Sequence, residues 1–438
     1  MPHIGHRTPE PSPQTEFAIN TATKLFAPPG ISATDEQHRA YLRYTHIGDP
    51  TADAVVAMFR QVPGEGRRMF ETAVEHGLAA VTDPPPELVA FFDEIDNPPY
   101  WLDPQRIELA CRAIGRTGAT IGFTTLSVAS LMGGYLAHRV SKTLTATADL
   151  EHRAPRRLAS TTAWFTEVTT PGGLQRSAAG WKTTIRVRLM HAVVRAGLSR
   201  RPEWRHDEWD LPVNASQMAG TIMMFSLAHM TGCQFLGLHF SRRERDAIFH
   251  LWRYVGHLLG VPPKILPVDE HDTWRLMSLQ AAHEFGQPDA DSVRLTQALI
   301  RAIIPAVVGE GAGPLQHLKR QTVNRLLLAY GRLILGRTNS DFLGLPDHKP
   351  AQAVVITAAA SIRILEFPRR LLPGATRWCE TRGRRGQLTL TRRMSVSHGG
   401  ARHSRHDHLA TAAARHHRDL DEGHAIPAGR ALGTDPRR

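Results

Sequence analysis

Apolar residues recur along most of this chain at the three- and four-residue spacing of an amphipathic helix, and no run of strand length alternates apolar and polar positions. Three segments open with Asp followed by Pro, which favour the cap and first turn of a helix, at Asp49, Asp83 and Asp103. The pattern predicts an all-α protein with helices over 51–60, 88–95, 107–114, 119–142, 155–168, 174–198, 213–239, 241–259, 268–285, 289–307 and 314–336.

Short turns rich in Gly and Pro separate these segments, which predicts neighbouring helices in a single domain over 31–370. One of them, Gly309–Pro314, superficially resembles a dinucleotide-binding loop. Because no strand precedes it, we interpret it as a turn between two helices.

Two stretches lack charged side chains for long enough to be considered as membrane spans, 117–137 and 211–241. Both contain many Thr, Ser, Gly, Asn, Gln or His residues, whereas a span needs about 20 predominantly apolar residues. We therefore expect two buried helices around a cavity and no transmembrane span.

The hydrophobic content of 42% suffices for a sizeable core, but the net charge of +12 is concentrated at the C-terminus. From Arg377 onward, 13 arginines stand against 6 acidic residues. This composition predicts a disordered, basic tail over 371–438, without a specific nucleic-acid partner. The leader 1–30 is polar and Pro-rich, and its lack of a secretory signal pattern predicts a cytoplasmic protein.

The segment 174–198 holds the main candidate chemistry. At about 100° per residue, His191 shares an apolar arc with Val187 and Val194, while Arg188 and Arg195 lie at the edge of that arc. A lone buried His is more often a hydrogen-bonded core residue than a metal ligand. The two arginines, if buried, need anionic partners, either carboxylates of a neighbouring helix or the propionates of a haem.

Arg157 and Thr161 on the preceding helix are four residues apart and face the same way, and His191 follows Thr161 by thirty residues. With this spacing the chain, over roughly 35–350, resembles the family of latex-clearing rubber oxygenases and their relatives in fungal mycophenolic acid biosynthesis. The family has haem b in a globin-like helical core. The resemblance implies that His191 is the axial iron ligand and that Arg157 and Thr161 lie on the distal side.

Two positions depart from the family pattern. Rubber oxygenases carry a distal Lys just before the Thr, and this chain has Ser160. The family's acidic residue, some twenty positions before the Thr, falls near Ser141, with Glu151 the next carboxylate downstream. The haem site is thus better supported than rubber cleavage.

Four further histidines compete as iron ligands, namely His229, His239, His250 and His257. Each is more often a hydrogen-bonded core or boundary residue, although one of them could supply a sixth ligand in the absence of the distal Lys. The three cysteines form no C-x-x-C pair, so any haem would be bound non-covalently. Motifs of hydrolases, zinc peptidases and di-iron bundles are absent, His283–Glu284 being only the start of a zinc motif.

The resemblance implies a haem b-dependent oxygenase that uses O₂, with an unidentified electron donor. Because the uncharged helices offer few charges, we expect its substrate to be apolar, isoprenoid- or lipid-like. We expect His191, Arg188 and Arg195 to bind the cofactor, and Arg157 and Thr161 to set the polarity of the distal pocket. Two alternatives remain open: a haem protein that acts as a sensor or carrier, and a helical binding protein without a cofactor.

Overall fold

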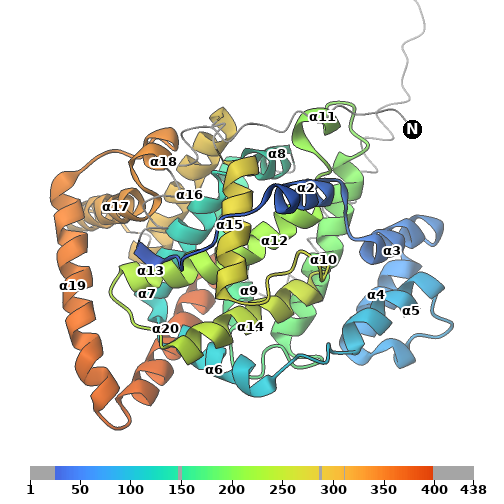
Figure 1. Ribbon diagram of the computed structural model, residues 1–438, viewed down its shortest axis with the longest axis horizontal. Coiled ribbons are helices and arrows are strands. Elements are labelled where there is room, and N and C mark those ends of the chain that lie inside the picture. Colours follow the sequence, from blue (N-terminus) through green and yellow to red (C-terminus); the bar gives the residue numbers. More distant parts are fainter. Residues whose placement is uncertain (1–24, 147–149, 286–288, 310, 398–438) are drawn as a thin grey trace, which may run out of the picture. The chain divides into compact units, whose positions relative to one another are not determined.

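The computed structural model describes residues 25–146, 150–285, 289–309 and 311–397, and within these ranges all regular structure is helical, as predicted. The helices, shown in Figure 1, are α2 (Asp35–Arg43), α3 (Pro50–Gln61), α4 (Glu65–His76), α5 (Pro86–Asp96), α6 (Pro104–Gly115), α7 (Gly118–Thr125), α8 (His138–Ala146), α9 (Leu150–Val168), α10 (Ala179–Leu198), α11 (His206–Trp209), α12 (Ala215–Met223), α13 (His229–Phe235), α14 (Arg242–Leu258), α15 (Glu270–Glu284), α16 (Ala290–Val308), α17 (Pro314–Leu335), α18 (Arg337–Phe342), α19 (Lys349–Leu371) and α20 (Ala375–Ser397).

Two of the three predicted Asp caps are confirmed. Asp49 accepts a hydrogen bond from the Ala52 amide at 3.1 Å, and Asp103 accepts one from the Gln105 amide at 2.9 Å. Asp83 instead has a positive φ of 50° and lies outside the helix, which begins at Pro86 with no side-chain cap. The turn predicted at Gly309 is also confirmed, because α16 ends at Val308 and α17 begins at Pro314.

Both uncharged stretches are buried helices, as predicted, but neither is one continuous α-helix. Leu126–Met132 follows α7 as a π-helical segment, and Met224–Ala228 links α12 to α13 in the same way. The two π-helical segments pack against each other. Such segments are rare and are frequent at functional sites, which marks this part of the interior for attention.

An apolar cluster fills the space between α9, α16, α17 and the first π-helical segment. Val128, Leu158, Leu299 and Tyr330 are among its buried members. In α16 and α17 the buried apolar side chains recur at helical spacing, so burial of one face stabilises each helix at about 25 cal/mol per Å² of apolar surface removed from water.

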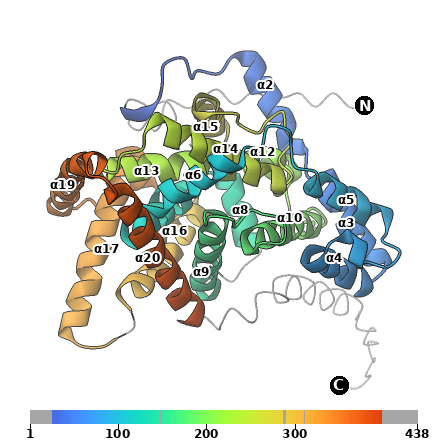
Figure 2. The same cartoon turned by 90° about the horizontal axis from the view of Figure 1, so that it is seen from below.

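The disordered tail predicted from 371 onward is wrong for 375–397. This segment forms α20, which returns from the end of α19 and packs on α6, α7 and α9 (Figures 1 and 2). Gly383 lies against the backbone of Gly115, and Arg384 donates to the carbonyl oxygen of Cys111 at 2.9 Å. A segment with few large apolar residues is thus held by close backbone packing and by polar contacts. The leader up to 24 and the segment 398–438 lie outside the described residues.

Candidate functional site

The helices α9 and α10, which carry the predicted site residues, form a closely packed antiparallel pair. The indole Nε1 of Trp164 donates to Thr184 Oγ1 at 2.9 Å, and Thr183 Oγ1 donates to Glu167 Oε2 at 2.8 Å. Because both helices rise by the same amount per residue, this register sets Thr161 at the level of Val187, and Arg157 at the level of His191. Tertiary structure therefore brings the two distal candidates to the same part of α10 as the predicted ligand.

His191 is half-buried, and its Nδ1 is fully buried without a hydrogen-bond partner. Burial, reinforced by the charge of Arg195 and opposed by that of Asp49, lowers the pKa of His191 to about 4. The imidazole is therefore neutral at pH 7, which is the form that binds a metal. No hydrogen bond to either of its ring nitrogens is present in the described part of the chain, so His191 does not behave as a satisfied core histidine.

The space beside His191 is small. A cavity of about 10 Å³ is bordered by His191, Arg195 and Met218, together with the backbone around Gly48 and Gly260. This volume holds about one water molecule. His191 therefore has the donor chemistry that a haem requires, whereas a tetrapyrrole would require the neighbouring helices or side chains to open.

The anionic partners of Arg188 and Arg195 are carboxylates of the protein. This is one of the two possibilities considered from the sequence, the other being haem propionates. Arg188 donates through Nε and Nη2 to Asp49 at 2.7 and 3.0 Å, and Nη2 also lies 3.0 Å from Glu94. Arg195 binds Asp53 at 2.7 Å and donates to the carbonyl oxygen of Val213 at 2.7 Å. In this structure the two arginines fix α10 to α3, and their charges are compensated without a propionate.

Arg157 differs from these two arginines. It is half-buried, and no carboxylate of the described residues lies within ion-pairing distance. Its charge acts on the buried hydroxyl of Tyr135, where it lowers a pKa that burial raises by more. Thr161, one turn further along α9, is also half-buried. Of the three arginines predicted to serve the site, Arg157 is the one whose charge remains available to an anion.

Aromatic side chains line α9 one turn beyond Thr161. Phe165 lies 4.9 Å from the ring of His229 and 5.8 Å from Trp252, and Phe225 stacks on Trp252 at 5.4 Å. His229 is buried, its Nε2 has no hydrogen-bond partner in the part of the chain that the structure describes, and burial lowers its pKa to about 4. The region thus combines an apolar aromatic wall with a second neutral imidazole.

The comparisons with known proteins match this region. A family model described as "ER-bound oxygenase mpaB/B'/Rubber oxygenase, catalytic domain" matches residues 116–364, more than half of the chain. The chain belongs to this family. Its matched segment contains Arg157, Thr161 and His191.

Individual relatives in the rubber oxygenase family are distant. The rubber oxygenase of Streptomyces sp. (strain K30) is 24% identical over 178 residues, which is 40% of this chain and 40% of that relative. The structure of latex clearing protein in the closed state superposes with a TM-score of 0.56 at 19% identity, covering 78% of this chain and 91% of that protein. This likeness establishes the shared all-α fold.

The two positions that depart from the rubber oxygenase pattern, Ser160 and Ser141, lie in different environments. Ser160 is exposed to solvent. Ser141 is a buried hydroxyl that donates to the Tyr135 carbonyl oxygen at 3.3 Å and lies 3.4 Å from the Ser292 hydroxyl. The side chain of Glu151 lies outside the described residues.

Glu284 is a buried carboxyl group that the sequence pattern did not single out. Its two oxygens are fully buried and accept no hydrogen bond in the described ranges, and Arg139 Nη1 lies 3.7 Å from Oε1. Burial raises its pKa to about 7, an effect that Arg139 opposes and Asp210 reinforces. The backbone carbonyl oxygen of Glu284 lies 3.1 Å from Nδ1 of His138, the first residue of α8. The end of α15 therefore lies beside the start of α8. Glu284 can therefore hold or release a proton near neutral pH.

Two further candidate histidines of this chain, His250 and His257, have surroundings that differ from those of His191. His250 accepts a hydrogen bond from the Asp103 amide at 2.9 Å, as expected for a core histidine. His257 stacks on Tyr254 and meets the edge of Trp101. Among the residues that the structure describes, no group of three or more His, Cys, Asp or Glu side chains could hold a metal ion.

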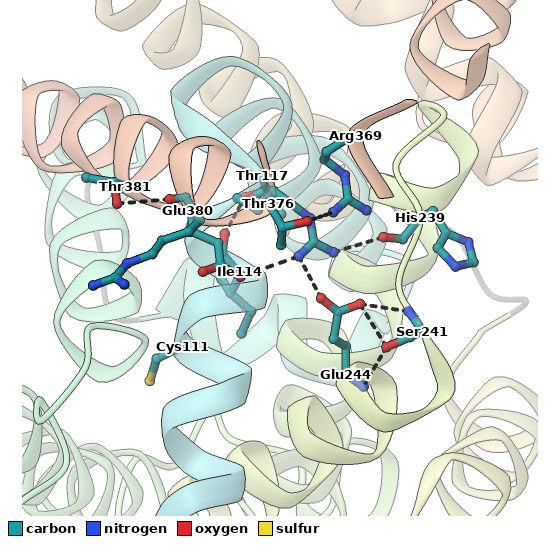
Figure 3. Close-up of polar contacts among 12 residues, drawn as sticks. Cys111, Ile114, Thr117, His239, Ser241, Glu244, Arg369, Thr376, Glu380 and Thr381 are labelled. Atoms are coloured by element: carbon teal, nitrogen blue, oxygen red, sulfur yellow. Dashed lines mark hydrogen bonds and ion pairs between the residues drawn. The ribbon is translucent and has the colours of Figure 1, made fainter. Parts of the chain in front are cut away.

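His239 lies in a polar groove of about 750 Å³ between α6, the start of α14 and the α19–α20 hairpin (Figure 3). Glu244, Arg369 and Glu380 also line the groove, and Arg116 Nη1 binds Glu244 Oε1 at 2.6 Å beside it. The groove carries charges of both signs, unlike the apolar pocket expected around an isoprenoid substrate. His239 thus lines this groove, whereas His191 does not. The groove is therefore not the site predicted around His191.

Proposed function

We propose that this protein is a haem b-dependent oxygenase that acts on an apolar, isoprenoid-like substrate. The observation that carries the proposal is the neutral imidazole of His191, which lies on α10 within the segment matched by the oxygenase family and has no hydrogen-bond partner among the described residues. Haem iron commonly takes an imidazole as its axial ligand. When bound, haem would supply the O₂ and redox chemistry that amino-acid side chains lack.

The chain's own residues would have distinct roles. His191 would hold the iron through a ring nitrogen. Arg157 would offer its guanidinium to an anionic group, either a propionate or a polar group of the reactants, because no carboxylate compensates its charge in the described structure. Thr161 would provide a hydroxyl on the same helix face. The aromatic wall around Phe165 and Trp252 would exclude water and favour an apolar substrate.

The cofactor is tested by purification from haem-supplemented cells. We expect a Soret band and about one haem b per chain, extractable with acidified butanone because no C-x-x-C-H motif is present. His191→Ala should lose the haem, whereas His257→Ala, which removes a histidine of α14, should retain it. Stoichiometric haem in His191→Ala would overturn the ligand assignment, and colourless parent protein would favour a binding protein without a cofactor.

The distal side is tested by Arg157→Ala and Thr161→Ala. Both variants should fold, and they should lower the oxidation of an apolar olefin such as squalene, measured as O₂ consumption and as oxygenated products by mass spectrometry. Arg157→Ala should also weaken haem retention if the guanidinium binds a propionate. Parent-like turnover and haem content in both variants would refute the roles given to Arg157 and Thr161.

A haem sensor or electron carrier is the second candidate, and His229 is the observation that favours it. Its buried, unpartnered Nε2 lies beside α9 and could provide a second axial nitrogen. A six-coordinate, low-spin spectrum that becomes five-coordinate in His229→Ala would support this candidate over the oxygenase. A ferrous parent protein that binds CO readily would support the oxygenase.

A further inference from the structure

The helix α19 has two apolar faces of which only one is covered by protein. Ala351 and Val355 are buried against the rest of the domain, and Glu366 on the same side accepts a hydrogen bond from the His239 amide at 2.9 Å. The opposite face carries an apolar stripe, defined as Ile356, Ile364, Phe367 and Leu371, whose members recur at helical spacing. Their exposed fractions are 52, 71, 60 and 67%.

Exposed apolar residues continue beyond the apolar stripe, with Leu372 in the turn after α19 and Trp378 in the first turn of α20. Leu372 is 60% exposed and Trp378 is 62% exposed. Both views show α19 at the edge of the domain, with α20 returning from its end (Figures 1 and 2). Contiguous exposed apolar surface of this kind is uncommon on a monomeric soluble domain and marks an interaction surface.

Exposed arginines lie beside the apolar stripe, in α19 and in α20. Between 361 and 385 the chain has seven arginines and two glutamates. Both glutamates are neighbours of arginines, since Glu366 pairs with Arg369 at 2.8 Å and Glu380 lies 3.9 Å from Arg116. Five of the arginines are exposed and have no carboxylate partner in the described part of the chain, namely Arg363, Arg370, Arg377, Arg382 and Arg385. The surface is therefore both apolar and strongly cationic.

Aromatic rings and guanidinium groups are paired on this surface. The guanidinium carbon of Arg370 lies 5.8 Å from the ring centre of Phe367, and that of Arg382 lies 5.4 Å from Trp378. Aromatic rings beside cationic side chains match the boundary between lipid headgroups and acyl chains, where the rings enter the apolar layer and the arginines meet phosphates.

By length and composition α19 could cross a membrane. Only 17% of its most apolar stretch is buried in the protein, so most of that stretch is free to meet lipid. Its last turns hold Arg363, Glu366, Arg369 and Arg370, and its inner face is bound to the domain through Glu366. A helix fixed along one side, with arginines at the edge of its free side, is suited to lie in a membrane surface.

We propose that the apolar stripe of α19, continued by Leu372 and Trp378, docks the protein on the surface of an anionic lipid bilayer. The stripe would enter the headgroup region, and the exposed arginines would bind the phosphates of anionic lipids. The proposal does not depend on the haem or on the oxygenase activity.

Vesicle flotation of the full chain tests the proposal, with phosphatidylcholine vesicles and with vesicles containing 30% phosphatidylglycerol. We expect binding to the anionic vesicles and at least tenfold weaker binding to the neutral ones. Phe367→Ser/Leu371→Ser/Trp378→Ser should reduce binding to anionic vesicles at least tenfold. The control Tyr100→Ser/Val268→Ser changes two residues that are also exposed, 99 and 53%, and should bind as the parent does.

The charge contribution is tested by Arg363→Gln/Arg370→Gln/Arg377→Gln, compared with Arg60→Gln/Arg68→Gln/Arg337→Gln, which removes three exposed arginines elsewhere. The first set should lower binding at least tenfold, and the second should change it less than threefold. A circular dichroism melt identifies any variant that fails to fold, and single substitutions then replace the triple ones.

Three outcomes would overturn the proposal. Parent-like vesicle binding in both hairpin variants would assign binding to other basic segments of the chain. Equal binding to neutral and anionic vesicles would remove the role of the arginines. Absence of vesicle binding, with either a dimer that the apolar variant disrupts or nucleic-acid binding that the arginine variant disrupts, would identify a different partner for this surface.

Discussion

Arginines occupy two contrasting environments in this protein. Arg188 of α10 is fully buried and is compensated by Asp49 and Glu94, whereas Arg370 of the α19–α20 hairpin is exposed and has no carboxylate partner in the described ranges. A buried guanidinium must have anionic or polar partners within the protein, because desolvation of an unpaired charge costs several kcal/mol. An exposed one is solvated by water and remains free to bind an external anion. The same residue type therefore stabilises the fold in one region and offers a binding surface in the other.

The largest effect on stability is expected when Arg188, the cation of its buried ion pair with Asp49, is replaced. Arg188→Met should lower the free energy of unfolding by about 3–5 kcal/mol, because Asp49 would be left buried without its partner. Urea denaturation monitored by circular dichroism measures this loss. A loss below about 1 kcal/mol would show that Asp49 is compensated in another way, and the contrast between the two environments would then fail.

The buried carboxyl group of Glu284, which accepts no hydrogen bond from the described residues, should make stability depend on pH. Because the pKa of Glu284 is raised to about 7 in the folded protein, its contribution is fully present below the unfolded pKa and is lost as the pH rises through 7. Relative to Glu284→Gln, the parent should therefore lose stability between pH 5 and pH 8, by up to about 3 kcal/mol. Thermal melts at both pH values measure the difference, and equal pH profiles would show that Glu284 is ionised in the folded protein without cost.

The buried histidines should change stability with pH in the direction opposite to Glu284, and the same melts measure their effect. Burial lowers the pKa of both His191 and His229 to about 4, so their contribution is present above the unfolded pKa and is lost as the pH falls towards 4. In the Glu284→Gln background the apoprotein should thus lose stability on acidification from pH 7 to pH 5. His229→Phe should reduce this loss, and an unchanged acid profile would contradict the burial of a neutral imidazole.

The hairpin also contains a buried portion, and Gly383 tests how it is held. A Cβ at Gly383 would clash with the Gly115 carbonyl oxygen, so Gly383→Ala should destabilise the protein by about 1–3 kcal/mol. At Gly386 the closest atom would be 3.5 Å away, and Gly386→Ala should be neutral or slightly stabilising because Ala favours a helix. Equal melting temperatures for the two variants would show that α20 does not pack on α6.

The smallest effect is expected on the exposed side. Arg370→Ala should change the free energy of unfolding by less than about 0.5 kcal/mol, since its guanidinium lacks a carboxylate partner within the described chain. Denaturation under the conditions used for Arg188→Met measures it. A loss comparable to that of Arg188→Met would mean that the hairpin arginines serve the fold and are not free for a ligand.

Local patterns in the sequence determined much of the secondary structure. The helical periodicity, the Asp caps at Asp49 and Asp103 and the turn at Gly309 follow from interactions among residues close in sequence, and all were predicted. The family resemblance likewise rested on a local spacing, that of Arg157, Thr161 and His191. What these residues do in the folded protein depends on their surroundings, and their roles remain proposals.

Only the tertiary structure decided which groups compensate each other. Asp49 precedes Arg188 by 139 residues, and from the sequence we expected Arg188 to bind the cofactor, with a carboxylate of a neighbouring helix as the alternative. The raised pKa of Glu284 depends on its burial, an effect that Arg139 opposes and Asp210 reinforces, and both of these residues are distant from it in sequence. Composition alone made α20 look disordered, although Gly383 packs against Gly115 at the end of α6 and Arg384 donates to the Cys111 carbonyl oxygen. Propensity and capping act over a few residues, whereas charge compensation, desolvation and close packing depend on neighbours that only the folded chain brings together.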